Sequence, residues 1–309
     1  MIGIEEIGIY IPDYRQMNGL KSYQGEKVDP DFIKNKVGFV STARKAEGEN
    51  TADMCQKAFH NLLSRVGDLD VNDIECICVC TQNGEYRMPH TSAILQDRLS
   101  LSGRCAAFDI SLACSGYIYG LGAIQSFMEF NNFSKGLLFT CDPYSKILDT
   151  EDKGTDLLFG DAATVTLLST KGSLKMGKST FYTKGASYDV AITHEGGHLL
   201  VDNRKIFNFV LREGMDTIQR CMKSNQITDK DVDVYLFHQA SKYVLDQLGR
   251  RMNIASEKVP FKAQTYGNTV SSSLPLMLQD YLEDDGIHSF FMCAFGAGLS
   301  AAATVLNRA

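Results

Sequence analysis

The chain has 309 residues, of which 44% are hydrophobic and 22% are charged, and its formal net charge is −6. This length is enough to bury one large core or two fused ones. No run of lysine and arginine stands out, so we expect no nucleic-acid partner, because phosphate neutralisation needs clustered positive charge. No apolar run approaches the ~20 residues of a membrane span, and we expect no such span.

The N-terminal segment MIGIEEIGIYIPDYRQMN predicts a β-strand rather than a signal peptide, because it carries early acidic residues and lacks a basic region. Nine cysteines follow, most of them in apolar runs such as IECICVCT and FFMCAFGAG. This usage indicates buried free thiols in a reducing compartment, so we expect a cytoplasmic protein. Cys76, Cys78 and Cys80 alternate like residues on one face of a strand, and the Cys-x-x-Cys turn of a zinc site is absent. We therefore expect no metal.

Short apolar runs alternate with helical patterns along the chain, which is typical of an α/β protein. The segment TADMCQKAFHNLLSRVG (51–67) predicts an amphipathic helix, and DIECICVCTQ (73–82) predicts the strand after it. The same order returns later as FNFVLREGMDTIQRCMKSN (207–225) and ITDKDVDVYLFHQA (227–240).

The two copies align at an offset of 158 residues, the distance from Asp73 to Asp231, which places Cys114 on Ser272. The segments SLACSGYIYGL and TVSSSLPLMLQ then coincide, and DAATVTLLS loosely matches SAAATVLNR. We predict two βα halves, residues 1–170 and 171–309, with the site in the cleft between them. Residues 171–206 are the least periodic part and predict a loop or hairpin region that could cover the site.

Cys114 lies where a β-branched and aromatic run gives way to a helical run of small residues. Free N–H groups and the positive end of the helix dipole favour a thiolate there and predict a lowered pKa. Cys114 is therefore the candidate nucleophile for acyl transfer through a thioester, and its own N–H can serve as one oxyanion donor. His238 and Asn268 lie in strand-to-helix turns of the second half, which the repeat brings towards Cys114.

Two other motifs match known patterns without their structural context. GSLKMGKS (172–179) has P-loop spacing, but a strand-like segment follows it where a phosphate-binding helix is required. HEGGH (194–198) has the spacing of a zinc protease, but its two glycines disfavour the helix by about 2 kcal/mol and predict a loop.

Six segments, taken together, resemble the β-ketoacyl-acyl-carrier-protein synthase III family, whose members have the thiolase fold. They are GIYIPDYRQMN, FDISLACSGYIYGL, LDTEDKGTDLLFGDAATVTLL, HQAS, YGNTVSSSLP and FGAGLSAAATVL. The resemblance runs over nearly the whole chain. It implies an α/β thiolase-like fold in which duplicated halves form α-β-α-β-α layers.

The resemblance also implies the chemistry. Cys114 would accept an acyl group from acyl-CoA, and His238 and Asn268 would hydrogen-bond a malonyl thioester during decarboxylative Claisen condensation. Backbone N–H groups of Cys114 and Ala297 would form the other oxyanion hole. No cofactor is implied besides the two thioester substrates. A homodimer is implied, in which Met88 would lie near the partner's pocket.

The chain departs from the family at its binding positions. Phe32 and Lys153 stand where the family clamps the adenine of CoA with tryptophan and arginine, and Lys36 replaces a further arginine. Ser241 and Tyr243 stand where an asparagine and a carrier-docking arginine are usual. These changes indicate a different acyl donor or carrier and favour a specialised acyl or polyketide pathway over fatty-acid initiation. Nearby cations offer another docking patch for an acidic acyl carrier protein, namely Lys242, Arg250 and Arg251.

Three alternatives stay open. An acyltransferase of the same fold would pass the acyl group to an alcohol or amine, with His238 as the base. A cysteine hydrolase shares the order Cys, His, Asn, although the papain-like flanking signature is absent and the internal repeat has no place there. A non-catalytic partner subunit fits the altered docking positions, although it does not explain the retained Cys114, His238 and Asn268.

Overall fold

The computed structural model describes residues 1–309, and one mixed sheet of ten strands forms its framework. The strand order is β14-β15-β16-β10-β1-β9-β8-β6-β7, with β11 also paired to β16. The bounds of these strands are β1 (Gly3–Tyr10), β6 (Cys76–Cys80), β7 (Ala106–Ile110), β8 (Lys135–Cys141), β9 (Ala163–Ser169), β10 (Leu174–Met176), β11 (Thr180–Thr183), β14 (Val234–Phe237), β15 (Ser289–Gly296) and β16 (Ser300–Arg308).

The sheet divides naturally between β1 and β10, which are joined by the single residue pair Ile4 and Leu174. Strands up to residue 169 lie on one side of this junction, and strands from residue 174 lie on the other. β1 pairs along its whole length with β9, as expected for the N-terminal segment read as a strand.

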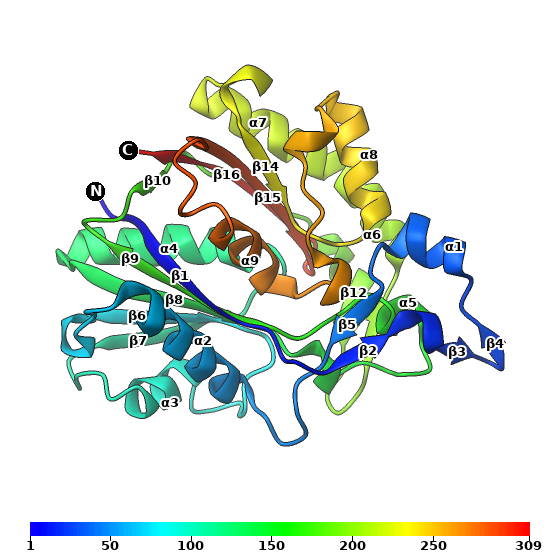
Figure 1. Cartoon of the computed structure of the whole chain (residues 1–309), viewed down its shortest axis with the longest axis horizontal. Coiled ribbons are helices and arrows are strands. Elements are labelled where there is room, and N and C mark those ends of the chain that lie inside the picture. Colours follow the sequence, from blue (N-terminus) through cyan, green and yellow to red (C-terminus); the bar gives the residue numbers. More distant parts are fainter.

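Nine helices and three small ribbons complete the chain (Figure 1). The helices are α1 (Pro30–Phe32), α2 (Thr51–Val66), α3 (Thr91–Arg98), α4 (Gly116–Asn131), α5 (Lys153–Asp156), α6 (Asn203–Phe209), α7 (Met215–Asn225), α8 (Lys242–Met252) and α9 (Ser273–Gln279). The ribbons pair β2 (Arg15–Met17) with β5 (Ser41–Ala43), β3 (Ser22–Tyr23) with β4 (Glu26–Lys27), and β12 (Ala191–Thr193) with β13 (Leu199–Val201).

Three large apolar cores hold the five layers of the molecule together. The central core holds α4 and α9 between the two sides of the sheet, as Figure 1 also shows. A second core packs α2 and α3 against the outer face of the first half, and a third packs α6, α7 and α8 against the outer face of the second half. The predicted α-β-α-β-α layering of a thiolase-like fold is confirmed.

Strand β6 shows how the sequence pattern produces this layering. Cys76 and Cys78 face the central core, whereas Ile77 and Val79 face the core under α2. Both faces of a parallel strand are then buried, so the strand is apolar at every position. All nine cysteines are free and buried, as predicted.

The predicted helix at 51–67 is confirmed as α2, which a reciprocal capping box between Asn50 and Asp53 begins. The helix predicted at 207–225 is longer than expected, because α6 starts at Asn203 and continues through a π-helical segment, Val210–Gly214, into α7. The π turn absorbs one extra residue without ending the helix.

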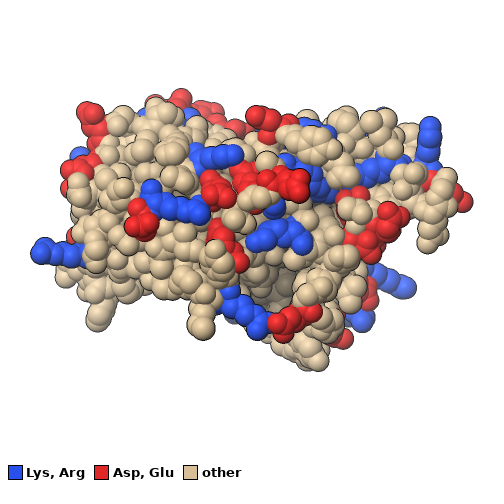
Figure 2. Space-filling model, turned by 90° about the horizontal axis from the view of Figure 1, so that it is seen from below, with Lys and Arg blue, Asp and Glu red and all other residues tan.

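Residues 171–206 form β10, β11, a 3-10 segment at Gly185–Val190, the β12–β13 hairpin and the start of α6. The P-loop-like segment 172–179 runs from β10 towards β11 with no helix after it. The HEGGH segment is the turn of the β12–β13 hairpin, where Thr193 pairs with Leu199. The predicted strand-like conformation after the first segment and the predicted loop at the second are confirmed. None of the helices has the length and hydrophobicity of a membrane-spanning segment, as expected from the sequence. On the face in Figure 2, lysine and arginine lie interspersed with acidic side chains.

Candidate active site

Cys114 lies in the turn between β7 and α4, as the sequence predicts. Ser115 directly precedes the helix, and its hydroxyl contacts that of Ser300 at 2.7 Å, which ties the turn to the second half. A side chain at Gly116 would collide with Cys80 Sγ, so only glycine lets α4 start this close to β6. Ser272 lies equivalently before α9, in agreement with the internal repeat.

His238 is the first residue after β14. Its backbone N–H donates to the carbonyl of Cys293 at 2.8 Å, which continues the pairing between β14 and β15. The ring is buried, and its Nδ1 atom is enclosed without a hydrogen-bond partner. Ser241 then caps α8 by accepting from the N–H of Val244.

Asn268 is held by both its backbone and its side chain. Its N–H donates to the carbonyl of Leu158 at 2.8 Å, and its carbonyl accepts from the N–H of Gly160 at 2.9 Å. The preceding Gly267 has a φ of +82°, which glycine adopts readily. The side-chain Oδ1 accepts from the N–H of Val270 at 2.9 Å. Because Oδ1 is occupied, the NH2 of the Asn268 amide is the group that can donate to a ligand.

One cavity of about 90 Å³ brings these residues together. Cys114, His238, Asn268 and Ala297 line it. The rest of the lining is largely apolar, and the β12–β13 hairpin contributes Leu199 and Val201. The ideal Cβ of an alanine at Gly296 would lie 3.0 Å from the backbone nitrogen of Cys114. This close approach brings the chain around Ala297 beside the predicted oxyanion donor.

The predicted lowering of the Cys114 pKa is wrong. Burial raises the pKa of this thiol, and the nearby carboxylate of Asp142 raises it further, against a smaller effect of its own backbone N–H. The helix end is present, but enclosure in an apolar cavity outweighs it. Burial also lowers the pKa of His238 to about 3. Both side chains are therefore neutral near pH 7.

Asp142 is a buried residue that the sequence analysis did not single out. It is the first residue after β8 and is fully buried. Burial raises its pKa to about 6, although hydrogen bonds from Gln82 and Ser271 lower it. A carboxylate directly after an apolar strand, LLFTCD, is the signal that could have identified it.

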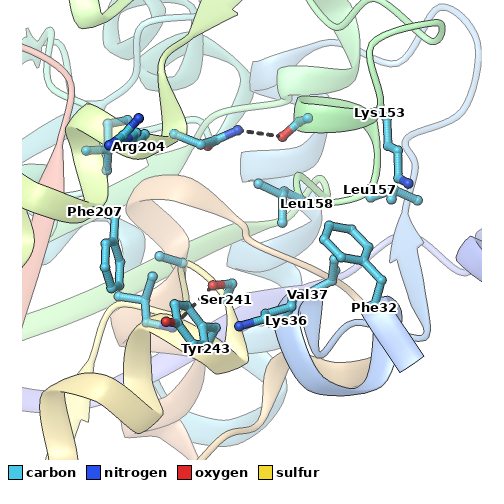
Figure 3. Close-up of a pocket in the computed structure, with 15 residues that line it drawn as sticks. Phe32, Lys36, Val37, Lys153, Leu157, Leu158, Arg204, Phe207, Ser241 and Tyr243 are labelled. Atoms are coloured by element: carbon cyan, nitrogen blue, oxygen red, sulfur yellow. Dashed lines mark hydrogen bonds between the residues drawn. The ribbon is translucent and has the colours of Figure 1, made fainter. Parts of the chain in front are cut away.

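An outer groove of about 350 Å³ adjoins the cavity (Figure 3). Four residues line both spaces, namely Leu158, Asn203, Ile206 and Ala240. The groove therefore leads from the surface towards Cys114. The predicted binding residues Phe32, Lys36 and Lys153 all line it.

Aromatic rings hold the lysines of the groove. Lys36 Nζ lies 3.7 Å from the centroid of the Tyr243 ring. The Tyr243 ring stacks on the Phe207 ring, with their centroids 5.4 Å apart. On the other wall Lys153 Nζ lies 4.8 Å from the centroid of the Phe32 ring. The substituted positions thus form cation–π pairs with each other.

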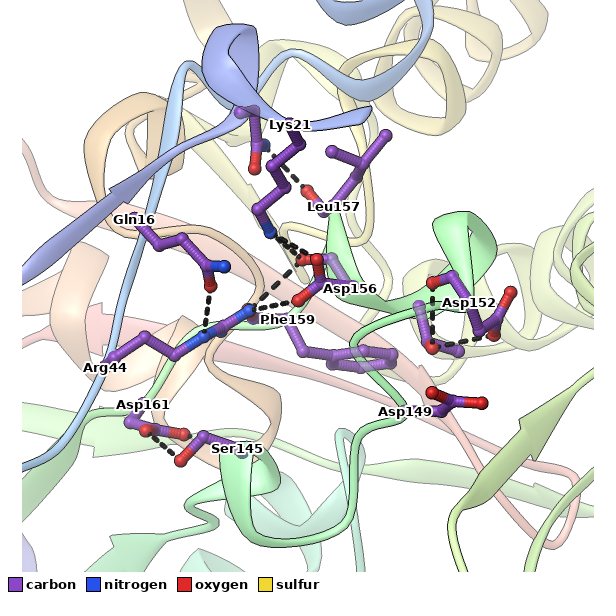
Figure 4. A network of polar contacts seen from close by, with 12 residues as sticks. Gln16, Lys21, Arg44, Ser145, Asp149, Asp152, Asp156, Leu157, Phe159 and Asp161 are labelled. Atoms are coloured by element: carbon purple, nitrogen blue, oxygen red, sulfur yellow. Dashed lines mark hydrogen bonds and ion pairs between the residues drawn. The ribbon is translucent and has the colours of Figure 1, made fainter. Parts of the chain in front are cut away.

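The segment between the groove and the cavity is anchored by a buried charge cluster (Figure 4). Asp156 accepts from Lys21 Nζ at 2.6 Å, from Tyr23 at 2.8 Å and from Arg44 at 3.0 Å. Arg44 also donates to the carbonyl of Phe159, which lines the cavity. The cluster fixes α5 and the chain after it against the β2–β5 region.

The remaining predicted residues lie at the surface. Met88 is 85% exposed in the loop before α3. Lys242 and Arg250 line a hollow of about 590 Å³ on α8. Arg251 does not line it, because the next residue of a helix points about 100° away, and its guanidinium donates to the carbonyl of Leu211.

No group of three or more His, Cys, Asp or Glu side chains is close enough to hold a metal ion. The site offers a thiol, a neutral imidazole, an amide NH2 and backbone N–H groups around one small apolar space. Such a set can hold an acyl group on sulfur and stabilise negative charge on a carbonyl oxygen.

Comparisons with known proteins agree with this chemistry. Residues 108–185 match the family model for 3-oxoacyl-[acyl-carrier-protein] synthase III, and residues 222–308 match the model for its C-terminal part. The β-ketoacyl-[acyl-carrier-protein] synthase III of Streptococcus agalactiae serotype III is 29% identical over 287 residues, which cover 87% of this chain and 88% of that protein.

Solved structures agree along the whole chain. A crystal structure of 3-oxoacyl-(acyl-carrier-protein) synthase III has a TM-score of 0.91 at 27% identity and covers 99% of both chains. The enzyme of that name from Aquifex aeolicus also has a TM-score of 0.91, at 25% identity, over 99% of this chain and all of the other. The chain therefore belongs to the β-ketoacyl-acyl-carrier-protein synthase III family of thiolase-fold condensing enzymes.

Proposed function

We propose that this protein loads an acyl group from acyl-CoA onto Cys114 and condenses it with a malonyl thioester, releasing carbon dioxide. One observation carries the proposal: Cys114, His238, Asn268 and Ala297 line a single cavity at the inner end of a groove. The proposed reaction serves fatty-acid or specialised acyl or polyketide biosynthesis and needs no cofactor besides the two thioesters.

Loading replaces one thioester with another. The Cys114 sulfur attacks the acyl carbonyl, the bond from that carbon to the sulfur of CoA breaks, and the proton of the thiol leaves with the CoA thiol. The backbone N–H groups of Cys114 and Ala297 stabilise the oxyanion. The raised pKa of Cys114 means that the resting thiol is protonated, so its proton leaves only during the transfer.

Condensation uses the neutral donors. His238 and the Asn268 NH2 hydrogen-bond the malonyl thioester oxygen, and loss of carbon dioxide leaves an enolate there. The enolate carbon attacks the Cys114 thioester, a carbon–carbon bond forms, and the Cys114 sulfur leaves and recovers a proton. The low pKa of His238 makes the ring a weak base. This favours a hydrogen-bond donor over the general base that an alcohol or amine acceptor would require.

The groove and its surroundings suggest how substrates arrive. We propose that a pantetheine arm lies in the outer groove, near Lys36 and Lys153, and that an acidic carrier protein contacts Lys242 and Arg250. Lys242 also contacts Asp246 at 2.8 Å, which reduces its free charge. Nine free buried thiols favour a reducing compartment such as the cytoplasm.

Intact-mass spectrometry after incubation with a panel of acyl-CoAs tests the proposal. The wild type should gain one acyl group, and addition of a malonyl thioester should discharge it with release of carbon dioxide. Cys114→Ala should gain no mass. Cys293→Ala is the matched control, because Cys293 is another buried thiol but lies outside the cavity lining.

Other results would redirect the proposal. An adduct that leaves with alcohols or amines but survives malonyl thioesters indicates the acyltransferase alternative. No adduct with any donor indicates a partner subunit without condensing activity of its own.

A further inference from the structure

A buried hydrogen bond joins the two halves of the chain beside the cavity. Ser271 Oγ donates to Asp142 Oδ2 at 2.6 Å, and both residues are fully buried. The other carboxylate oxygen accepts from the N–H of Gln82 at 2.8 Å. Because β6 and β8 are parallel neighbours, Gln82 and Asp142 leave the sheet at the same edge. Asp142 therefore connects the chain after β6 to the chain before α9.

The residue next to Ser271 is strained. Val270 has a φ of +54° and is fully buried. This left-handed conformation is unfavourable for a β-branched side chain and persists only where the surroundings hold it. The N–H of Val270 is also the donor that occupies Asn268 Oδ1. The orientation of the Asn268 amide thus depends on a strained residue.

We propose that Asp142 and Ser271 are positioning residues for Asn268, because their hydrogen bond holds Val270 in the conformation that keeps the Asn268 NH2 directed into the cavity. The inference rests on the proposed function, in which that NH2 stabilises the malonyl enolate.

Loss of the contact has a specific consequence. Val270 relaxes towards negative φ, and its N–H turns away from Asn268 Oδ1. The amide then rotates freely and presents its oxygen to the enolate oxygen, which is repulsive. Loading of Cys114 uses backbone donors and not the Asn268 amide. Condensation therefore slows while loading does not.

The test compares two adjacent buried serines. Ser271→Ala removes the contact with Asp142. Ser272→Ala is the matched control, because Ser272 is equally buried but bonds Thr140 and the carbonyl of Ala162 instead. Loading is followed by intact mass with acyl-CoA alone, and condensation by carbon dioxide release from a malonyl thioester on the pre-acylated protein.

Ser271→Ala should slow condensation by roughly 10- to 100-fold, below the full loss of an oxyanion donor, with loading within about twofold of wild type. Ser272→Ala should change both steps by the same factor. Asp142→Asn should keep most of the condensation rate, because its amide can still accept from Gln82 and donate to the Ser271 hydroxyl. A retained rate in Asp142→Asn shows that the hydrogen bond, and not the negative charge, positions Asn268.

Three results would overturn the inference: equal slowing of both steps in Ser271→Ala, the same split in Ser272→Ala, or an unchanged condensation rate in Ser271→Ala. Each presupposes that the wild type performs both steps. A wild type that loads but does not condense contradicts the proposed function itself.

Discussion

At the scale of single residues, the nucleophile is controlled by two opposed effects. The backbone N–H of Cys114, just before α4, lowers the pKa of its thiol, but burial and the Asp142 carboxylate raise it by more. A protonated resting thiol is protected from oxidation, since the thiolate is the reactive form. Asp142 therefore acts on the site in two ways: its charge raises the pKa of Cys114, and its carboxylate accepts the hydrogen bond from Ser271.

Asp142→Asn should therefore make Cys114 more reactive. Removing the negative charge lowers the pKa of the thiol towards its ordinary value, so the thiolate fraction at pH 8 increases. We expect faster alkylation by iodoacetamide, by up to roughly tenfold for one pKa unit. The measurement is the rate of mass gain, with Asp142→Asn/Cys114→Ala as the blank.

The same carboxylate makes stability depend on pH. Burial raises the pKa of Asp142 to about 6, above the ordinary value of 3.8, so the folded protein binds this proton more tightly than the unfolded chain does. Its contribution to stability is present below about pH 4 and is lost as pH rises through 6. Asp142→Asn should gain stability relative to wild type over this interval. Urea unfolding at pH 4 and pH 7 checks the sign, and a constant difference between the two proteins would contradict it.

At the scale of elements, short segments depend on buried polar contacts. The four-residue helix α5 cannot be stable alone, since isolated helices shorter than about 12 residues are marginal. Asp156 at its end binds Lys21 and Arg44 in the interior. This contact holds the lining of both the groove and the cavity in place.

Asp156→Ala should lower the free energy of unfolding by about 3–5 kcal/mol, because two buried cations lose their partner. Chemical denaturation measures it. Glu195→Ala is the control, since Glu195 forms an exposed ion pair with Arg87 that contributes at most about 1 kcal/mol. Equal effects of the two substitutions would show that the buried cluster is not a structural anchor.

At the scale of the whole molecule, the sheet ends at β7 with an open edge. All five residues of β7 are half-buried, and Phe108 packs there against Phe127, which in turn contacts Phe133. An unpaired strand edge is a surface on which a second chain can add. Met88, at 85% exposure, is the residue that we expect a second copy to cover.

Light scattering in solution should give twice the 34.2 kDa mass of the chain. Phe108→Glu should shift the protein towards a monomer, because it places a charge on the apolar edge. Phe130→Glu is the control, since Phe130 is 87% exposed on α4. A single-chain mass for the wild type would contradict the homodimer.

The local structure and the identity of the main site residues could be predicted from the sequence. The N-terminal strand, the alternating cysteines of β6, the amphipathic pattern of α2 and the 158-residue repeat depend on neighbours along the chain, so the sequence predicts them without the fold. The repeat also placed Cys114 and Ser272 at equivalent helix starts. The motifs around Cys114, His238 and Asn268 predicted residues that the structure brings to one cavity.

The environment of those residues depends on tertiary contacts that the sequence does not reveal. The Cys114 pKa changes in the direction opposite to prediction, because burial depends on residues as distant in sequence as Phe209 and Phe295. Asp142 and Ser271 are 129 residues apart, and Lys21 and Asp156 are 135 apart. Desolvation and long-range hydrogen bonding have no local pattern, and these are the forces that determine charge and orientation in this site.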